Sequence, residues 1–261
     1  MLRRLALLDT ETTGTADEDP AIEVAVVLFD VPCAAIVASW SSLIRHGDDP
    51  QNPAEPVNGI PAELLREAPP AGEVWAAARA FAASAEAFVA HGAAFDRARV
   101  PGEVWEGRPW ICSMDHLDWP GQLRPGESLV SLALRHGLGV ATAHRAMADC
   151  ELLARLFARV AEGGADLQAM LARGLRSRAR YRAVLSYERR EEARAAGFRW
   201  DAARRAWWRE MAVEDAGALP FPVRDLDEGE PGGLGAEEAV EVDYEELRRR
   251  GLELLEKARS R

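Results

Sequence analysis

Four acidic residues and one histidine occupy positions in the sequence from which they could carry out metal-assisted chemistry. The first two, Asp9 and Glu11, belong to the segment DTETTG, which follows a short apolar run. Because side chains alternate along a strand, both carboxylates are expected on the same face. Neighbouring carboxylates repel unless a cation lies between them, and their oxygens suit Mg²⁺ or Mn²⁺. The alternative is that the two acids simply begin a solvated turn.

The other candidates come later in the chain. Asp96 follows an apolar run and falls in the first turn of a predicted helix, where it could merely complement the helix dipole. Asp149 lies five residues after His144, near the start of a helix whose leucines face inward. That helix can direct Asp149 towards the sheet edge where Asp9 and Glu11 emerge. His144 falls in the preceding loop, and the alternative for it is an ordinary surface histidine.

The elements that must position these residues are predicted from hydrophobic patterning and turn residues. Strands are expected at residues 3–8, 22–30, 35–44, 86–90 and 110–112. Helices are expected at residues 60–67, 73–85, 95–100, 128–136 and 147–162. Three strands come first and the later units alternate with helices, which predicts an α/β fold with a mixed sheet covered on both faces.

The amino-acid composition excludes several classes of protein. The 261 residues are 48% hydrophobic and 29% charged, as in ordinary globular domains, so global disorder is not expected. The apolar runs are far shorter than the ~20 residues that a membrane crossing needs, and no membrane partner is expected. The first apolar stretch stops at Asp9, unlike a secretory signal. Three widely spaced cysteines form no disulfide framework, so we expect a cytoplasmic protein.

In this order and context the acidic motifs resemble those of the DnaQ-like (DEDDh) 3′–5′ exonuclease family. The first motif corresponds to Asp9 and Glu11, the second to Asp96, and the third to His144 and Asp149, spaced as in the histidine subclass. The resemblance covers roughly residues 1–162 and extends to the VNGI turn at 57–60. Residues 88–96 and 109–114 are most similar to the exonuclease X branch. One departure is a glycine at position 92, where the family commonly has an asparagine that contacts the terminal nucleotide.

This resemblance implies a ribonuclease H-like mixed five-stranded sheet flanked by helices. It also implies two Mg²⁺ ions, with Mn²⁺ as a substitute. Asp9 would bridge the ions, Glu11 and Asp149 would complete the ligands of one, and Asp96 would hold the other. His144 would take a proton from the attacking water. The product would be a nucleoside 5′-monophosphate released from the 3′ end.

Substrate contacts are expected from four residues near the motifs: Thr10, Thr12, His91 and Phe95. We expect DNA rather than RNA as the substrate, in repair or proofreading, with a DNA polymerase or repair protein as a partner of the C-terminal region. Two alternatives remain open. One is an exoribonuclease of the same fold, and the other is a non-catalytic nucleic-acid-binding or polymerase-associated subunit.

Beyond the exonuclease domain, expected at 1–162, the character of the sequence changes. We expect a basic linker helix at 163–180, a small α+β module at 181–222, an acidic flexible linker at 223–238 and an amphipathic helix at 239–261. Residues 172–210 hold twelve arginines and five acidic residues, although the chain carries a net charge of −11.

Nucleic-acid contacts are expected from the module's Arg199, Trp200, Arg204, Arg205, Trp207 and Trp208. Their aromatic faces could stack on bases while the arginines neutralise phosphates. The alternative is that the aromatic residues are all core and the arginines form a solvated face.

Overall fold

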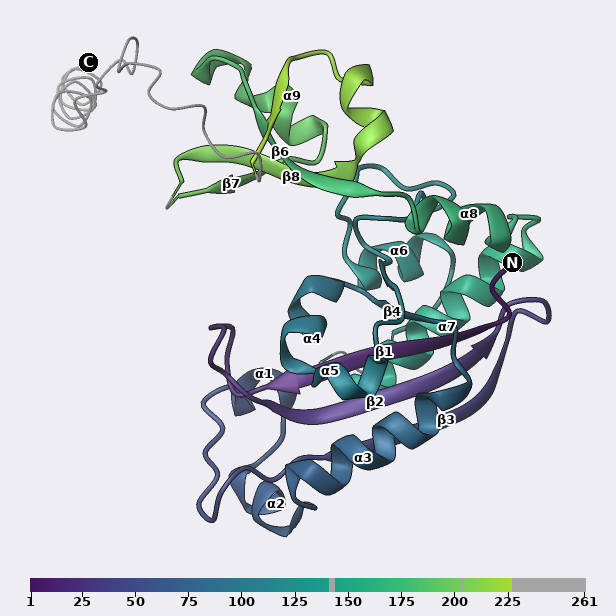
Figure 1. The fold of residues 1–261 in the computed structure, drawn as a ribbon, viewed down its shortest axis with the longest axis vertical. Helices are drawn as coiled ribbons and strands as arrows, with labels where there is room; N and C mark the ends of the chain where they lie inside the picture. The colour runs from purple at the N-terminus through teal and green to yellow at the C-terminus, as the bar shows by residue number, and fades with distance from the viewer. Residues whose placement is uncertain (141–143, 203, 227–261) are drawn as a thin grey trace, which may run out of the picture. The chain divides into compact units, whose positions relative to one another are not determined.

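The central sheet is built around β1 (Arg4–Thr12), in the strand order β3-β2-β1-β4-β5. A computed structural model describes residues 1–140, 144–202 and 204–226 (Figure 1). β2 (Ala21–Asp30) and β3 (Ala35–Leu43) form an antiparallel meander with β1, whereas β4 (Ala87–Ala90) and β5 (Trp110–Cys112) run parallel to it. The predicted mixed five-stranded sheet is confirmed.

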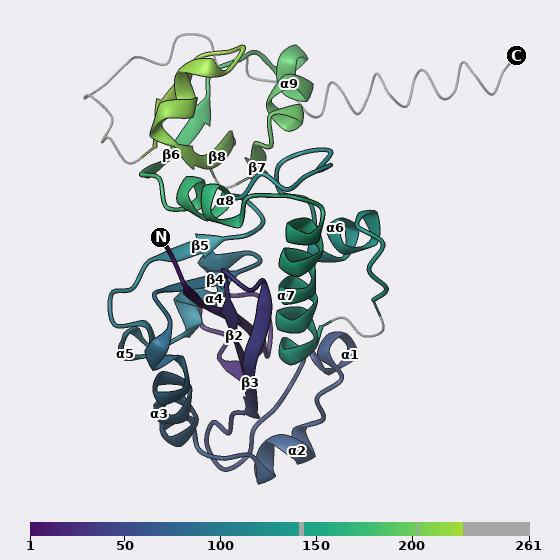
Figure 2. The ribbon, with the colours of Figure 1, turned by 90° about the vertical axis from the view of Figure 1, so that its right-hand side faces the viewer.

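The two faces of this sheet are covered by different helices. On one face Leu5 and Leu7 pack in the same cluster as the leucines of α7 (Ala146–Glu162). On the other face Ala6 and Leu8 pack with α3 (Ala71–Phe81). Figure 2 shows α7 and α3 on opposite sides of the strands. The alternation of side chains along β1 therefore decides which residues face α7, and it continues through Asp9 and Glu11.

Most predicted elements of this domain are present within a few residues of their expected bounds. β1 is longer than expected because its pairing with β2 continues to Thr12, so that the acidic motif lies within the strand. Two short helices, α1 (Glu55–Asn58) and α5 (Gly102–Trp105), lie between the predicted elements. The remaining helices are α2 (Ala62–Glu67), a 3₁₀ turn (Ala82–Ser84), α4 (Ala93–Arg99) and α6 (Leu129–Arg135).

The expected basic helix at 163–180 contains two different elements. α8 (Leu167–Gly174) buries Leu167 and Leu171 in the same cluster as α7. It lies so close to β5 that a Cβ atom at Gly174 would be 2.7 Å from Ile111 Cγ2. Residues 178–180, expected to be helical, instead begin a strand. Their sequence, RARYRA through residue 183, alternates with a period of two and so favours β structure.

A second, four-stranded antiparallel sheet forms the C-terminal module, in the order β7-β8-β6-β9. Its strands are β6 (Arg178–Ala183), β7 (Arg199–Asp201), β8 (Ala206–Ala212) and β9 (Val223–Asp225). α9 (Arg190–Ala195) and 3₁₀ turns at Tyr187–Arg189 and Val213–Ala218 complete it, around a core that includes Tyr181, Phe198, Met211 and Phe221. The predicted α+β module is confirmed.

The start of the acidic linker expected at 223–238 forms strand β9, and the rest of that linker, with the helix expected at 239–261, lies outside the described residues. None of the helices in the described ranges combines the length and apolar character that crossing a membrane requires.

Candidate active site

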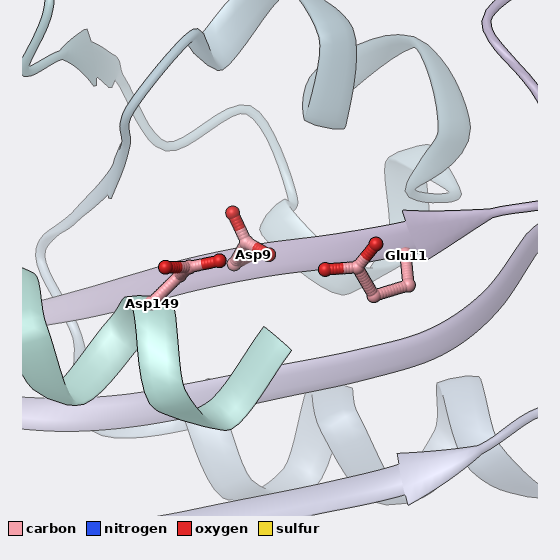
Figure 3. Close-up of side chains that lie close together, drawn as sticks. All are labelled: Asp9, Glu11 and Asp149. Atoms are coloured by element: carbon pink, nitrogen blue, oxygen red, sulfur yellow. The ribbon is translucent and has the colours of Figure 1, made fainter. Parts of the chain in front are cut away.

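Three carboxylates converge where β1 passes the first turn of α7. Asp9 and Glu11 project from the α7-facing side of β1, and Asp149 projects from the helix towards them (Figure 3). One oxygen atom from each of Asp9, Glu11 and Asp149 can be chosen so that all three lie within 4.8 Å of one another. The three residues predicted to share one ion thus come from segments about 140 positions apart in the sequence.

Asp96 lines the same cavity but lies outside this group of three. It is buried in the first turn of α4, where its Oδ1 atom accepts hydrogen bonds from the Thr10 backbone N–H (3.0 Å) and the Thr10 hydroxyl (2.8 Å). The hydroxyl of Thr10, expected at the substrate, therefore orients Asp96. Thr12 is also buried, and its hydroxyl donates to the Gly14 carbonyl oxygen.

The electrostatics of this cluster disfavour its ionised state. Burial, followed by repulsion from Asp96 and Asp149, raises the pKa of Asp9 well above its usual value. Burial and then Asp149 raise the pKa of Glu11 to about 7. Burial raises the pKa of Asp96 to about 7, although the hydrogen bonds from Thr10 act in the opposite direction. The pKa of Asp149 is also raised, chiefly by burial.

A divalent cation fits this set of side chains. The donors are all carboxylate oxygens, which Mg²⁺ and Mn²⁺ prefer. Positive charge placed among them would favour the ionised carboxylates and reverse the rise in their pKa values. The ionised carboxylates therefore repel one another in the metal-free protein and are stabilised when a cation binds.

His144 lies at the edge of this cavity and is exposed. Its backbone N–H donates to Asp149 Oδ2 over 3.1 Å, and its backbone has a φ of 61°, which is uncommon for a residue with a side chain. This turn places His144 in the lining of the cavity that contains the carboxylates.

Glu23 is a residue of the site that the sequence reasoning missed. It lies opposite Glu11 in the register of β1 and β2, and its side chain is 5% exposed. Its carboxylate accepts from Arg145 Nε (3.0 Å) and Nη2 (2.8 Å) and from the Ala146 N–H (3.1 Å). Glu23 thereby holds Arg145, which precedes α7, and Ala146, the first residue of α7, and with them the turn that carries Asp149. The available signal was a single charged residue inside an otherwise apolar strand.

The wall of the cavity opposite α7 is formed around His91. One ring nitrogen is 3.0 Å from Ser113 Oγ and the other is 3.1 Å from the Glu127 carbonyl oxygen. Burial lowers the pKa of His91 to about 4, so the ring is neutral at physiological pH. Phe95 lines the same wall, in a cavity of about 400 Å³.

Gly92, the departure from the family pattern, lies at this wall. Its φ is +110°, a conformation that residues with a side chain rarely adopt. The space itself is open, because an added Cβ would meet its nearest neighbour, Met114 Cε, at 4.0 Å. Crowding therefore does not exclude a side chain here, and the backbone conformation is one that glycine adopts most readily.

Comparison with known proteins identifies the domain that carries this site. A profile of the family described as "Exonuclease" matches residues 7–157, more than half of the chain. The chain belongs to this exonuclease family. Over 158 residues it is also 32% identical to the DNA polymerase III subunit epsilon of Treponema pallidum (strain Nichols), a match that covers 57% of this chain and 72% of that protein.

Two solved structures are similar to this exonuclease. Exonuclease X in complex with 5′ overhanging duplex DNA has a TM-score of 0.50 and 28% identity, covering 65% of this chain and 99% of that one. E. coli exonuclease I in complex with a dT13 oligonucleotide has a TM-score of 0.50 and 16% identity, covering 70% of this chain and 48% of that one. The second similarity concerns the fold alone.

The DnaQ-like 3′–5′ exonuclease family predicted from the three motifs is confirmed, including the similarity to exonuclease X. The protein is a nuclease of a divalent-metal-dependent family, and it binds nucleic acid. The C-terminal module has a separate match at residues 179–226, to a family described as "Domain of unknown function (DUF8626)".

The six module residues expected at nucleic acid occupy the hairpin of β7 and β8 and its turn. Arg199 forms an ion pair with Asp115 at 2.7 Å, and Arg204 forms one with Asp201. The half-exposed ring of Trp200 lies 5.8 Å from that of Trp207, which packs against the module core. Arg205 is exposed, and Trp208 is partly buried.

Proposed function

We propose that this protein is a 3′–5′ exonuclease that removes nucleoside 5′-monophosphates from the 3′ ends of DNA, using two Mg²⁺ ions. The observation that carries the proposal is the convergence of Asp9, Glu11 and Asp149 beside the buried Asp96 in one open cavity. The names of the relatives support DNA as the substrate, since one is a DNA polymerase subunit and another was solved with DNA.

In the proposed site Asp9, Glu11 and Asp149 would hold one ion, and Asp9 and Asp96 would hold the second. Mn²⁺ is expected to substitute for Mg²⁺. When bound, such ions stabilise the negative charge that develops on the attacking and leaving oxygens of phosphodiester hydrolysis. Thr10 keeps the Asp96 carboxylate turned towards the cavity, and Glu23 keeps the start of α7 in place.

His144 is the proposed general base. It is exposed at the cavity edge and adjacent to the carboxylates, so that it can accept a proton from the attacking water and pass it to solvent. Imidazole is the side chain best suited to such a transfer near neutral pH.

The terminal nucleotide is proposed to lie between β1 and the wall formed by His91 and Phe95. Because His91 is neutral and both ring nitrogens have partners in the free protein, it contributes shape and polarity without charge. The Phe95 ring is fixed beneath the Arg99 guanidinium, 3.6 Å from its centre, and offers an apolar surface to a sugar or base.

A second candidate function is a proofreading subunit that acts within a polymerase assembly. The relative named as a DNA polymerase III subunit favours this possibility. In this arrangement the exonuclease chemistry is the same, and the polymerase or a repair protein would bind through the C-terminal region.

The experiment that tests the proposed substrate compares matched single-stranded DNA and RNA oligonucleotides with Mg²⁺ and identifies the released product. We expect 5′-mononucleotides and a faster initial rate on DNA. A faster rate on RNA would identify an exoribonuclease. No cleavage of either strand, despite bound metal, would favour a non-catalytic subunit.

A further inference from the structure

One face of the module's sheet is lined with arginines. Along β6 the residues alternate, with Arg178, Arg180 and Arg182 on one face and Ala179, Tyr181 and Ala183 on the other. The second set packs into the module core beneath α9, so the arginines occupy the opposite face, where Arg178 is partly buried and donates to the His116 carbonyl oxygen. Arg180 and Arg182 are both exposed.

The register of the four strands extends this pattern into a row. Arg199 lies opposite Trp208, Trp208 lies opposite Arg182, and Arg182 lies opposite Arg224. Residues directly opposite in antiparallel strands project from the same face. Three arginines and one tryptophan, hereafter the arginine row, therefore cross the whole sheet. With neighbouring strands about 4.8 Å apart, the row spans roughly 14 Å.

The fold alone gives no reason for such a row. Like charges directly opposite each other destabilise a sheet, as Arg182 and Arg224 do here. Both are exposed, and neither forms an ion pair with any residue in the described part of the chain. Their charges remain available to an anionic ligand, which would remove the repulsion.

The arginine row begins beside the active site. A second cavity, of about 320 Å³, is lined by Arg199 and Glu210 of the module and by Gly92, Phe95 and Arg97 of the nuclease domain. Gly92 and Phe95 also line the cavity that contains the carboxylates. An ion pair of Arg199 with Asp115 and a hydrogen bond between His116 Nε2 and Glu210 hold the module to this segment of the nuclease domain. A strand whose end lies at the carboxylates can therefore continue past Phe95 to Arg199.

We propose that the arginine row binds a single-stranded nucleic acid whose 3′ end occupies the active site. This inference rests on the proposed function and adds a path for the upstream strand. Arg182 and Arg224, on the adjacent strands β6 and β9, would contact phosphates, and the partly buried ring of Trp208 beside Arg182 would stack on a base. A single strand is favoured over a duplex because stacking on Trp208 requires an unpaired base.

The arginine row differs from the set of residues expected from the sequence. Trp200 and Trp207 pair with each other on the opposite, core-facing side of the hairpin, and the new members are Arg182 and Arg224. These two are also the best residues to test. They are exposed, and they lie away from both cavities.

The test measures binding of fluorescent dT30 and rU30 to the full chain in EDTA, so that cleavage does not interfere, over a series of salt concentrations. The variant Arg182→Ala/Arg224→Ala should bind on the order of tenfold more weakly at low salt. The slope of log affinity against log salt should fall by about 1.4, because each phosphate contact to a single strand contributes about 0.7. Arg182→Lys/Arg224→Lys should keep most of the slope.

The matched control is Arg190→Ala/Arg194→Ala, which removes the same charge from α9 on the other side of the module. It should leave affinity and slope almost unchanged. Equal losses in both variants would indicate a general charge effect and overturn the proposal. Unchanged binding of the Arg182/Arg224 variant would also overturn it.

Two further readouts separate this proposal from the proposed function. Cleavage of a dinucleotide, too short to reach the row, should be equal in the unmodified protein and the Arg182/Arg224 variant. A dinucleotide that neither protein cleaves would count against the proposed function while leaving the binding result intact. Whether the arginine row binds DNA or RNA is shown by which of dT30 and rU30 loses affinity in the Arg182/Arg224 variant.

Discussion

The carboxylate cluster on the central sheet and the arginine row on the module's sheet are both groups of like charges, but they differ in burial. The carboxylates are partly or fully buried, so their pKa values rise and they need a cation to stay ionised. The arginines are exposed, so they stay charged and their interactions are screened by salt. If both proposals hold, the carboxylates form a metal centre of fixed geometry and the arginines form an extended, salt-sensitive surface for the strand.

Among the changes that test this comparison, metal removal should have the largest effect on activity. Chelation should abolish cleavage, while salt-sensitive binding of a long strand should persist. Titration of the chelated protein with Mn²⁺ should restore activity, with two ions bound per chain at saturation. Full cleavage in excess EDTA, with no metal detected in the protein, would contradict the assignment of the cluster.

Replacement of the proposed general base should have the next largest effect. A general base typically contributes about 10²–10⁴-fold, so His144→Ala should lower kcat on a dinucleotide by a factor in that range. The stoichiometry of Mn²⁺ binding should not change, because the His144 side chain is not a proposed ligand. His136→Ala, at the end of α6, is the control. An equal loss in that variant would point to a folding defect.

Replacing Glu23, which holds the first turn of α7, should reduce activity less than replacing the residues that it positions. Glu23→Gln keeps the shape of the side chain but removes the charge that holds Arg145, so the first turn of α7 should loosen. Groups behind metal ligands typically contribute 10–100-fold, and we expect a loss of that order in kcat or Mn²⁺ affinity. The matched control is Asp30→Asn, which breaks the Arg4–Asp30 pair near the other end of the same two strands. Equal effects of the two substitutions would rule out a positioning role for Glu23.

The smallest expected effect is that of pH on the thermal stability of the metal-free protein. Carboxyl groups whose folded-state pKa is raised bind more protons in the folded than in the unfolded protein between pH ~4 and pH ~7. In EDTA their contribution to stability should therefore fall as pH rises through this window, lowering the Tm by a few degrees. Saturating Mg²⁺ should offset the loss, and Glu11→Gln should flatten the dependence. The raised pKa values would be contradicted if the Tm of the unmodified protein in EDTA rose across this pH window and the Glu11→Gln variant showed the same slope.

How much the sequence could predict differs between the two regions. Asp9 and Glu11 are two residues apart on one strand, and Asp149 lies in the first turn of a strongly patterned helix, so local periodicity predicted their faces, while the resemblance to the family assigned them to one ion. Glu23 was missed because its role depends on the register of β2 against β1, which no local pattern specifies.

The same reason applies more strongly to the module. The alternation of β6 was present in the sequence, but the high arginine content there also suited an exposed helix. The neighbours of Arg182, namely Trp208 and Arg224, come from strands 26 and 42 residues away and meet it only through tertiary pairing. Two tryptophans that looked equivalent in sequence, Trp207 and Trp208, project from opposite faces because they are adjacent in one strand.

The most direct test of the carboxylate cluster as the catalytic centre uses a single Asp9→Asn substitution. Unmodified protein and variant are incubated with 5′-labelled single-stranded DNA and Mg²⁺, and the products are separated at single-nucleotide resolution. We predict stepwise shortening from the 3′ end by the unmodified protein and an intact strand with the variant, whose circular dichroism spectrum should match. A correctly folded Asp9→Asn protein that produces the same ladder at a similar rate would contradict the central claim.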